Sequence, residues 1–204
     1  MSGPRVVLAT GNAGKREEFA AMLPDLVLLT LRDIGIDDIP EPHADFVRNA
    51  AVKARACATR SGMPALADDS GLAVDALLGA PGVFSARFGG AHGDDAGNRR
   101  RLVDALRGVP DARRGARFRC VLVLADPHGP LGDALLVAQG IVEGHITTAP
   151  RGHGGFGYDP LFVPLGSSMT LAEMSDGEKA ARSHRGRAVR ALGPALRSYL
   201  LRRA

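Results

Sequence analysis

The segment that most constrains the fold is an apolar run at residues 6–9, which passes through the glycine-rich turn "TGNAGK" into a charged, helix-like stretch at residues 15–23. A strand, a glycine turn, a lysine and a helix start in this order indicate phosphate binding, because glycines let backbone N–H groups approach an anion at a helix N-terminus. The turn is not a Walker A loop: Ala9 stands where that pattern needs glycine, and Arg16 where it needs serine or threonine. The sequence therefore predicts a phosphate-binding turn of another class.

Length and composition predict a single domain, with room for two lobes. The chain has 204 residues, 45% of them hydrophobic, which is enough to bury one core. Its longest apolar run, residues 120–125, is far shorter than the roughly 20 residues that cross a bilayer, and residues 6–9 are too few for a signal-peptide core, so we expect a cytoplasmic protein without a membrane partner. Cys57 and Cys120 lack metal-ligand spacing and are interpreted as buried thiols in a reducing compartment.

A net charge of +4 raises the possibility of nucleic-acid binding. The basic residues cluster at 98–101, 112–119 and 201–204, but the chain has no tryptophan and two tyrosines on which bases could stack. Charge runs are usually solvated faces, so we expect no nucleic-acid partner.

Hydrophobic periodicity predicts an α/β fold around a mixed sheet. We expect strands at residues 5–10, 26–30 and 161–163, and an antiparallel hairpin formed by residues 116–126 and 134–146. Helices are expected from Asp45 to Gly62, from Asp94 to Gly108, after the capping-box sequence "SDGE", and at the C-terminus, where Gly193-Pro194 should interrupt the last one. Residues 68–90 are too rich in glycine to predict any long element.

Two adjacent acids, Asp68 and Asp69, follow a short apolar run and should mark a strand end. Neighbours in a strand point to opposite faces, so one side chain can face the core and the other a cleft. A carboxylate there could hold Mg²⁺ or deprotonate a water, both of which phosphate transfer needs. A plain turn is the alternative interpretation.

Three lysines are candidates for binding phosphate oxygens: Lys15 in the glycine turn, Lys53 in the second helix and Lys179 after "SDGE". Taken singly, a lysine is more often a solvated surface residue, and the glycine turn around Lys15 and the neighbourhood of Lys179 favour the binding role.

The loop "GGFGYDP" and the later "SHRG" could bind a base. Phe156 could stack on it and Asp159 could accept a proton from a ring N–H, although a hairpin turn also explains the glycines. His184 and Arg185 could donate to a ligand carbonyl, or instead interact with the dipole at the end of the helix that carries Lys179.

Taken together, "TGNAGK", "ADDSGLAVDALLGAPGVFSAR", "GGFGYDPLFVP" and "EKAARSHRGRA" resemble the motifs of the inosine triphosphate pyrophosphatase family, the dITP/XTP pyrophosphatases. The related Maf proteins share the fold but not "SHRG". The resemblance implies an elongated mixed sheet with flanking helices in two lobes around a central cleft, a homodimer, and hydrolysis of ITP, dITP or XTP to the monophosphate and pyrophosphate.

The resemblance also implies roles for individual residues. Asp69 matches the proton acceptor and Mg²⁺ ligand, and Glu41 falls where a metal-binding glutamate would, although the Gly and Thr of the family's E-T-G-x-T-F are absent from "EPHADF". The positions implied for purine nucleoside triphosphate binding are Thr10, Gly11, Asn12, Ala13, Gly14, Lys15, Lys53, Ser70, Phe156, Gly157, Tyr158, Asp159, Lys179, His184 and Arg185.

Two other functions stay open on the sequence: a pyrophosphatase of broader nucleotide specificity, and a basic nucleotide- or nucleic-acid-binding protein without turnover.

Overall fold

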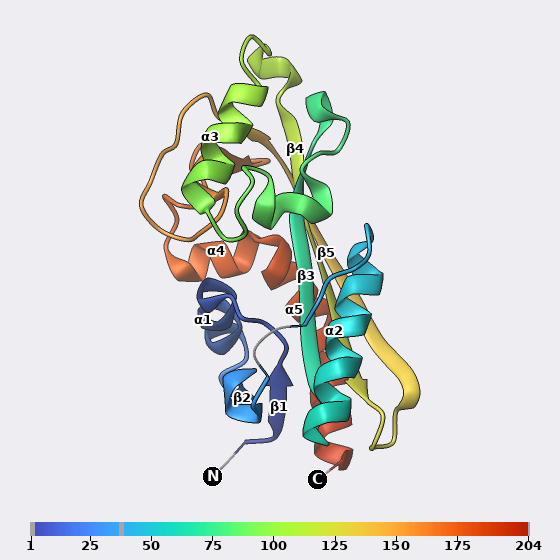
Figure 1. The fold of residues 1–204 in the computed structure, drawn as a ribbon. Coiled ribbons are helices and arrows are strands. Elements are labelled where there is room, and N and C mark those ends of the chain that lie inside the picture. The colour runs from blue at the N-terminus through green and yellow to red at the C-terminus, as the bar shows by residue number, and fades with distance from the viewer. Residues whose placement is uncertain (1–2, 37–38, 204) are drawn as a thin grey trace. The chain divides into compact units, whose positions relative to one another are not determined.

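The structure, a computed structural model, describes residues 3–36 and 39–203. A six-stranded sheet has the order β2-β1-β3-β4-β5-β6. Strand β1 pairs parallel with β2 and β3, whereas β6 pairs antiparallel with β5, so the sheet is mixed and the predicted α/β class is confirmed. The strands are β1 (Arg5–Leu8), β2 (Val27–Leu29), β3 (Ala65–Val74), β4 (Gly115–Asp126), β5 (Gly132–Ile146) and β6 (Phe162–Pro164). The α-helices are α1 (Ala13–Met22), α2 (Phe46–Ser61), α3 (Asp95–Ala105), α4 (Asp176–Arg182) and α5 (His184–Arg203) (Figure 1).

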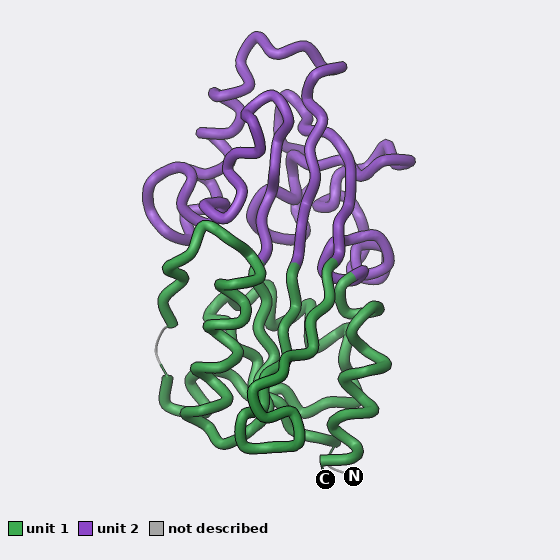
Figure 2. The backbone as a smooth tube through the Cα atoms, turned by 90° about the vertical axis from the view of Figure 1, so that its right-hand side faces the viewer, with its two compact units in different colours: residues 1–69, 121–139, 188–204 green, residues 70–120, 140–187 purple. Residues whose placement is uncertain are grey.

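The chain forms two compact units (Figure 2). Unit 1 contains residues 1–69, 121–139 and 188–204, and unit 2 contains residues 70–120 and 140–187. Strands β3, β4 and β5 and helix α5 each contribute residues to both units.

Helix α2 packs on the sheet of unit 1 through small side chains. The side chain of Asp45 caps its first turn by accepting from the Arg48 N–H, and Gly62 ends it in the left-handed conformation, as the sequence predicts. Its buried alanines let the helix backbone approach the strands closely. The core of unit 1 brings together Val7, Ala9, Ala50, Ala54, Cys57, Ala58, Ala65, Ala67, Val121, Val123 and Ala125.

Helix α3 anchors the core of unit 2. Asp94 caps its start, and Leu102 and Leu106 at its end are fully buried, as the periodicity predicts. They pack among the inward-facing residues of β3, β4, β5 and β6, which are Leu72, Val74, Ala116, Phe118, Val142, Ile146 and Phe162.

Two expectations about the elements are wrong. Strand β3 does not stop at the acidic pair but runs ten residues, through Gly71. A side chain at Gly71 would overlap the carbonyl oxygen of Gly82, so this glycine serves a close approach and does not mark a strand end. Helix α5 continues through Pro194, because the buried Leu192 and Leu196 hold the helix against its core despite the lost N–H.

Candidate active site

The glycine turn of unit 1 leads into the N-terminus of α1. Asn12 is the capping residue, and its side chain accepts from the backbone N–H of Lys15 at 2.9 Å, while the Thr10 hydroxyl accepts from the Asn12 N–H at 3.2 Å. Gly11, Asn12 and Ala13 are exposed. The first turn of α1 holds no acidic residue, so the positive end of its dipole is available to an anion.

Both lysines predicted in unit 1 lie against the acidic pair of β3. The Lys15 ammonium forms an ion pair with the fully buried Asp68. Lys53, which is only 6% exposed, donates to the Glu41 carboxylate at 2.5 Å and to the Asp68 carbonyl oxygen at 2.7 Å, and lies 3.8 Å from Asp69. A solvated surface lysine is therefore the wrong interpretation of Lys53, which instead carries a buried positive charge within a carboxylate cluster.

Asp69 is the member of this cluster with spare hydrogen-bonding capacity. It is 4% exposed, and its Oδ2 accepts no hydrogen bond from any residue in the described ranges 3–36 and 39–203. Burial raises the pKa of Asp69 to about 6; the charge of Lys53 opposes this rise and that of Glu41 adds to it. Asp69 is consequently a carboxylate that can accept a proton near neutral pH.

Glu41 is the second candidate metal ligand. Burial works against its ionisation, but the charge and hydrogen bond of Lys53 outweigh burial and lower the pKa of Glu41, so it is a carboxylate at neutral pH. Within the part of the chain that the structure describes, no group of three or more His, Cys, Asp or Glu side chains is arranged to hold a metal. The carboxylates of Asp69 and Glu41 are hard oxygen donors, and Oδ2 of Asp69 accepts no hydrogen bond from a described residue. This pair fits Mg²⁺, which proteins hold through one or two carboxylates together with substrate phosphates.

Unit 2 brings together a second set of predicted residues. Lys179, 5% exposed, forms a 2.6 Å ion pair with the buried Asp159, which also accepts from the Phe156 N–H at 2.9 Å. The surface interpretation is therefore wrong for Lys179 as well. Gly155 lies so close to this pair that a side chain there would overlap it.

The Phe156 ring lies against two cations. The Lys179 ammonium is 5.0 Å from the ring centroid and the Arg185 guanidinium 5.2 Å, distances typical of cation–π contacts. Arg185 also donates to the Ser70 hydroxyl at 3.1 Å. Positive charge is therefore gathered around the one aromatic ring that we expect to contact a base.

His184 is held by stacking. Its ring lies parallel to that of Phe118, with centroids 4.6 Å apart and planes at 9°. The expectation that His184 and Arg185 end the preceding helix is wrong: α4 ends at Arg182, and the two residues begin α5, where the helix dipole does not attract cations. Sequence reasoning missed Phe118, whose only signal was its inward register in an alternating strand.

The last two predicted residues of the loop are held by other parts of unit 2. The buried Tyr158 donates its hydroxyl to the Ser85 carbonyl oxygen at 2.8 Å, and burial followed by the charge of Asp95 raises the pKa of Tyr158. Gly157 has a φ of +60° and is hydrogen-bonded by Asp95 and Arg99 of α3. Neither α3 residue was predicted as part of a site.

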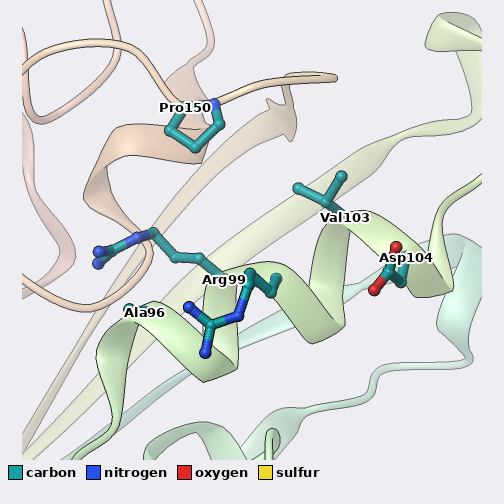
Figure 3. Close-up of a pocket in the computed structure, with 6 residues that line it drawn as sticks. Ala96, Arg99, Val103, Asp104 and Pro150 are labelled. Atoms are coloured by element: carbon teal, nitrogen blue, oxygen red, sulfur yellow. The ribbon is translucent and has the colours of Figure 1, made fainter.

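A pocket of about 440 Å³ is lined by residues of α3 and by Pro150, and none of the predicted site residues lines it. Figure 3 shows Arg99 among the side chains that line this pocket, on the face of α3 toward Pro150.

None of the described helices is both long and apolar enough to span a membrane.

Comparison with known proteins agrees with the motifs. The model of the Ham1 family matches residues 6–195. The dITP/XTP pyrophosphatase of Xanthomonas campestris pv. campestris (strain 8004) is 50% identical over 189 residues, covering 92% of this chain and 94% of that protein. The dITP/XTP pyrophosphatase of Nocardia farcinica is 48% identical and covers 96% of each chain.

Solved structures give the same result. A HAM1 protein from Coxiella burnetii superposes with a TM-score of 0.84 at 40% identity, covering 95% of this chain and 98% of that one. The family resemblance inferred from the motifs is confirmed, and this chain belongs to the Ham1 family.

Proposed function

We propose that this protein hydrolyses deaminated purine nucleoside triphosphates (ITP, dITP and XTP) to the monophosphate and pyrophosphate. Relatives about 50% identical over more than nine-tenths of the chain carry the name dITP/XTP pyrophosphatase. The observation that carries the proposal is the buried Asp69, which has a raised pKa and a bare oxygen, beside lysines that can bind phosphate.

The phosphates would bind in unit 1. The exposed start of α1 offers N–H groups and a favourable dipole, and Lys15 and Lys53 offer positive charge. A water molecule attacks the α-phosphorus, an O–P bond forms, and the bond from that phosphorus to the bridging oxygen of the pyrophosphate breaks. Asp69 takes the proton of the water, and the lysines stabilise the negative charge that grows on the leaving pyrophosphate.

We propose Mg²⁺ as the cofactor, held by Asp69 and Glu41. When bound, the ion neutralises charge on the phosphate oxygens. Lys53 already donates to Glu41 and lies near Asp69, so it keeps both carboxylates ionised and ready for a cation.

The base would bind in unit 2. Phe156 would stack on it, Asp159 would accept from a ring N–H, and His184 and Arg185 would donate to the oxygen at position 6. Adenine carries an amino group at that position and would leave the donors unpaired, a mismatch that can reach about 10⁴-fold in specificity.

We also propose that the enzyme works as a homodimer in the cytoplasm without nucleic-acid partners. Size-exclusion chromatography and cell fractionation would test the oligomeric state and the localisation.

The test measures pyrophosphate release from ITP, dITP, XTP, GTP and ATP, with and without Mg²⁺. Release from the deaminated purines alone supports the proposal, comparable rates on all five favour a broad pyrophosphatase, and no release favours a binding protein. Asp69→Asn should lower turnover at least about a hundredfold, the usual scale for losing a general base. Asp133→Asn, on a fully exposed side chain of the same unit, is the matched control and should change nothing.

A further inference from the structure

The loop proposed to bind the base depends on helix α3 for its shape. The N–H of Gly157 donates to the Asp95 carboxylate at 2.7 Å, and the Gly157 carbonyl oxygen accepts from the Arg99 guanidinium at 2.8 Å. One glycine is thus held on both sides by two charged side chains one helical turn apart. Figure 1 shows α3 beside the orange part of the chain that lies between β5 and α4 in the sequence.

Gly157 is one of two glycines that flank Phe156. It stands directly after Phe156 and has a φ of +60°, a conformation that glycine adopts without strain, and because glycine has no Cβ its backbone can also adopt many others. Bonds to charged groups are about twice as strong as neutral ones. Two such bonds on one flexible residue therefore restrict the adjoining aromatic ring.

Helix α3 is itself fixed to the neighbouring part of unit 2. Asn98 accepts from the Gly89 N–H at 2.6 Å and donates to the Ala86 carbonyl oxygen at 3.2 Å. From the same segment, Ser85 accepts from the Tyr158 hydroxyl at 2.8 Å through its carbonyl oxygen. The helix, the segment 82–90 and the loop 154–159 thus form a closed ring of contacts.

We propose that Asp95 and Arg99 are positioning residues that clamp Gly157 and thereby hold Phe156 in place for the base. The expected kinetic effect of the clamp rests on the proposed function. The residues of the clamp belong to unit 2, whereas the phosphate-binding turn and the carboxylate cluster belong to unit 1. Loss of the clamp therefore weakens recognition of the base and leaves the chemical step unchanged.

The kinetic test uses Asp95→Ala and Arg99→Ala with ITP as substrate. Each variant should raise KM about tenfold or more, the expected effect of losing a hydrogen bond to a charged group, and change kcat little. Inorganic tripolyphosphate, which has no base, should inhibit the variants and the wild type with the same constant. Asp95→Asn keeps an oxygen acceptor for the Gly157 N–H and should remain within about threefold of the wild type.

The matched control is Asp104→Ala, because Asp104 lies on the same helix and forms an exposed ion pair with Arg107. It should leave KM and kcat unchanged. Two results would overturn the proposal in favour of a general loss of structure. One is a rise of both KM and the inhibition constant of tripolyphosphate in Asp95→Ala, and the other is an equal rise of KM in Asp104→Ala.

A second measurement needs no substrate, so it separates failure of the clamp from failure of the proposed function. The chain contains no tryptophan, so Phe156→Trp places a single reporter on the loop. Adding Asp95→Ala to this variant should increase quenching of its fluorescence by acrylamide, and adding Asp104→Ala should not. Unchanged quenching in Asp95→Ala would refute the clamp, whether or not the wild type hydrolyses ITP.

Discussion

Replacing Asp69 with asparagine should stabilise the fold while it removes activity. The pKa of Asp69 rises from an ordinary 3.8 to about 6, mainly because of burial. At about 1.4 kcal/mol for each tenfold change in proton affinity, the ionised carboxylate costs the folded state about 3 kcal/mol near neutral pH. Asparagine resembles the protonated acid and does not carry this cost.

The sign of the pH dependence follows from the raised pKa. Stability that the protonated group provides is complete below the unfolded pKa of 3.8 and is lost as the pH rises through about 6. The advantage of Asp69→Asn should therefore be about 3 kcal/mol near pH 8 and about half of that near pH 5. In a chain of this size, 3 kcal/mol corresponds to a rise in Tm of about 6 to 12 °C.

The assay is urea unfolding followed by circular dichroism near both pH values, with EDTA present so that divalent ions do not compete. Asp68→Asn is the matched control, because it makes the same change one residue earlier in β3. Asp68 is fully buried and paired with Lys15, so removing its charge should destabilise the protein. An Asp69→Asn variant that is less stable than the wild type near pH 8, or whose gain does not shrink on acidification, would refute the reasoning.

Three further predictions concern buried thiols and buried tyrosine hydroxyls. Burial raises the pKa of the Cys57 thiol to about 11, and Cys120 is buried as well. A thiol reagent should therefore label neither cysteine in the native protein and both cysteines in urea. Rapid labelling of the native protein would contradict the burial. Tyr199→Phe removes the 2.6 Å hydrogen bond to the fully buried Asp126 and should lower the free energy of unfolding by about 1–3 kcal/mol in the same urea assay. Tyr158→Phe removes the hydrogen bond to the Ser85 carbonyl oxygen and should lower the free energy of unfolding by a similar amount.

Elements set by neighbouring residues could be predicted from the sequence. The bounds of α2 follow from an aspartate cap and a glycine stop, and the start of α4 from the capping box of Ser175 and Glu178. The length of β3 could not be predicted, because a glycine such as Gly71 typically breaks a strand. Gly71 instead allows the close approach of Gly82, which lies in a segment that periodicity does not connect to β3. Local signals therefore located both ends of α2 and the start of α4, but not the end of α4 or the strand that carries the acidic pair.

The same distinction separates the predicted site residues from the missed ones. The sequence suggested Lys179 as a phosphate or surface lysine, and its burial became evident only with Asp159, twenty positions earlier, beside it. Phe118 contacts His184 and Asp95 contacts Gly157, but no motif links the members of either pair. Motifs identify residues that contact a ligand, whereas residues that position them are found only through contacts between distant segments. The individual ligand contacts stay predictions.

The acidic pair shows how far a local pattern can go. Strand alternation predicts that Asp68 and Asp69 face opposite sides, and the structure gives them different partners: Asp68 takes the charge of Lys15, and Asp69 keeps an oxygen that no described residue bonds. Alternation alone does not say which of them is the base, because the two are chemically identical and the answer depends on where the lysines fall. Here Lys15 neutralises the fully buried acid. Lys53 lies 3.8 Å from the other acid, too far for a hydrogen bond, but its charge lowers the pKa of Asp69 and so opposes the effect of burial. An exchange of these partners would leave the unbonded oxygen on Asp68 and would favour Asp68, rather than Asp69, as the proposed base.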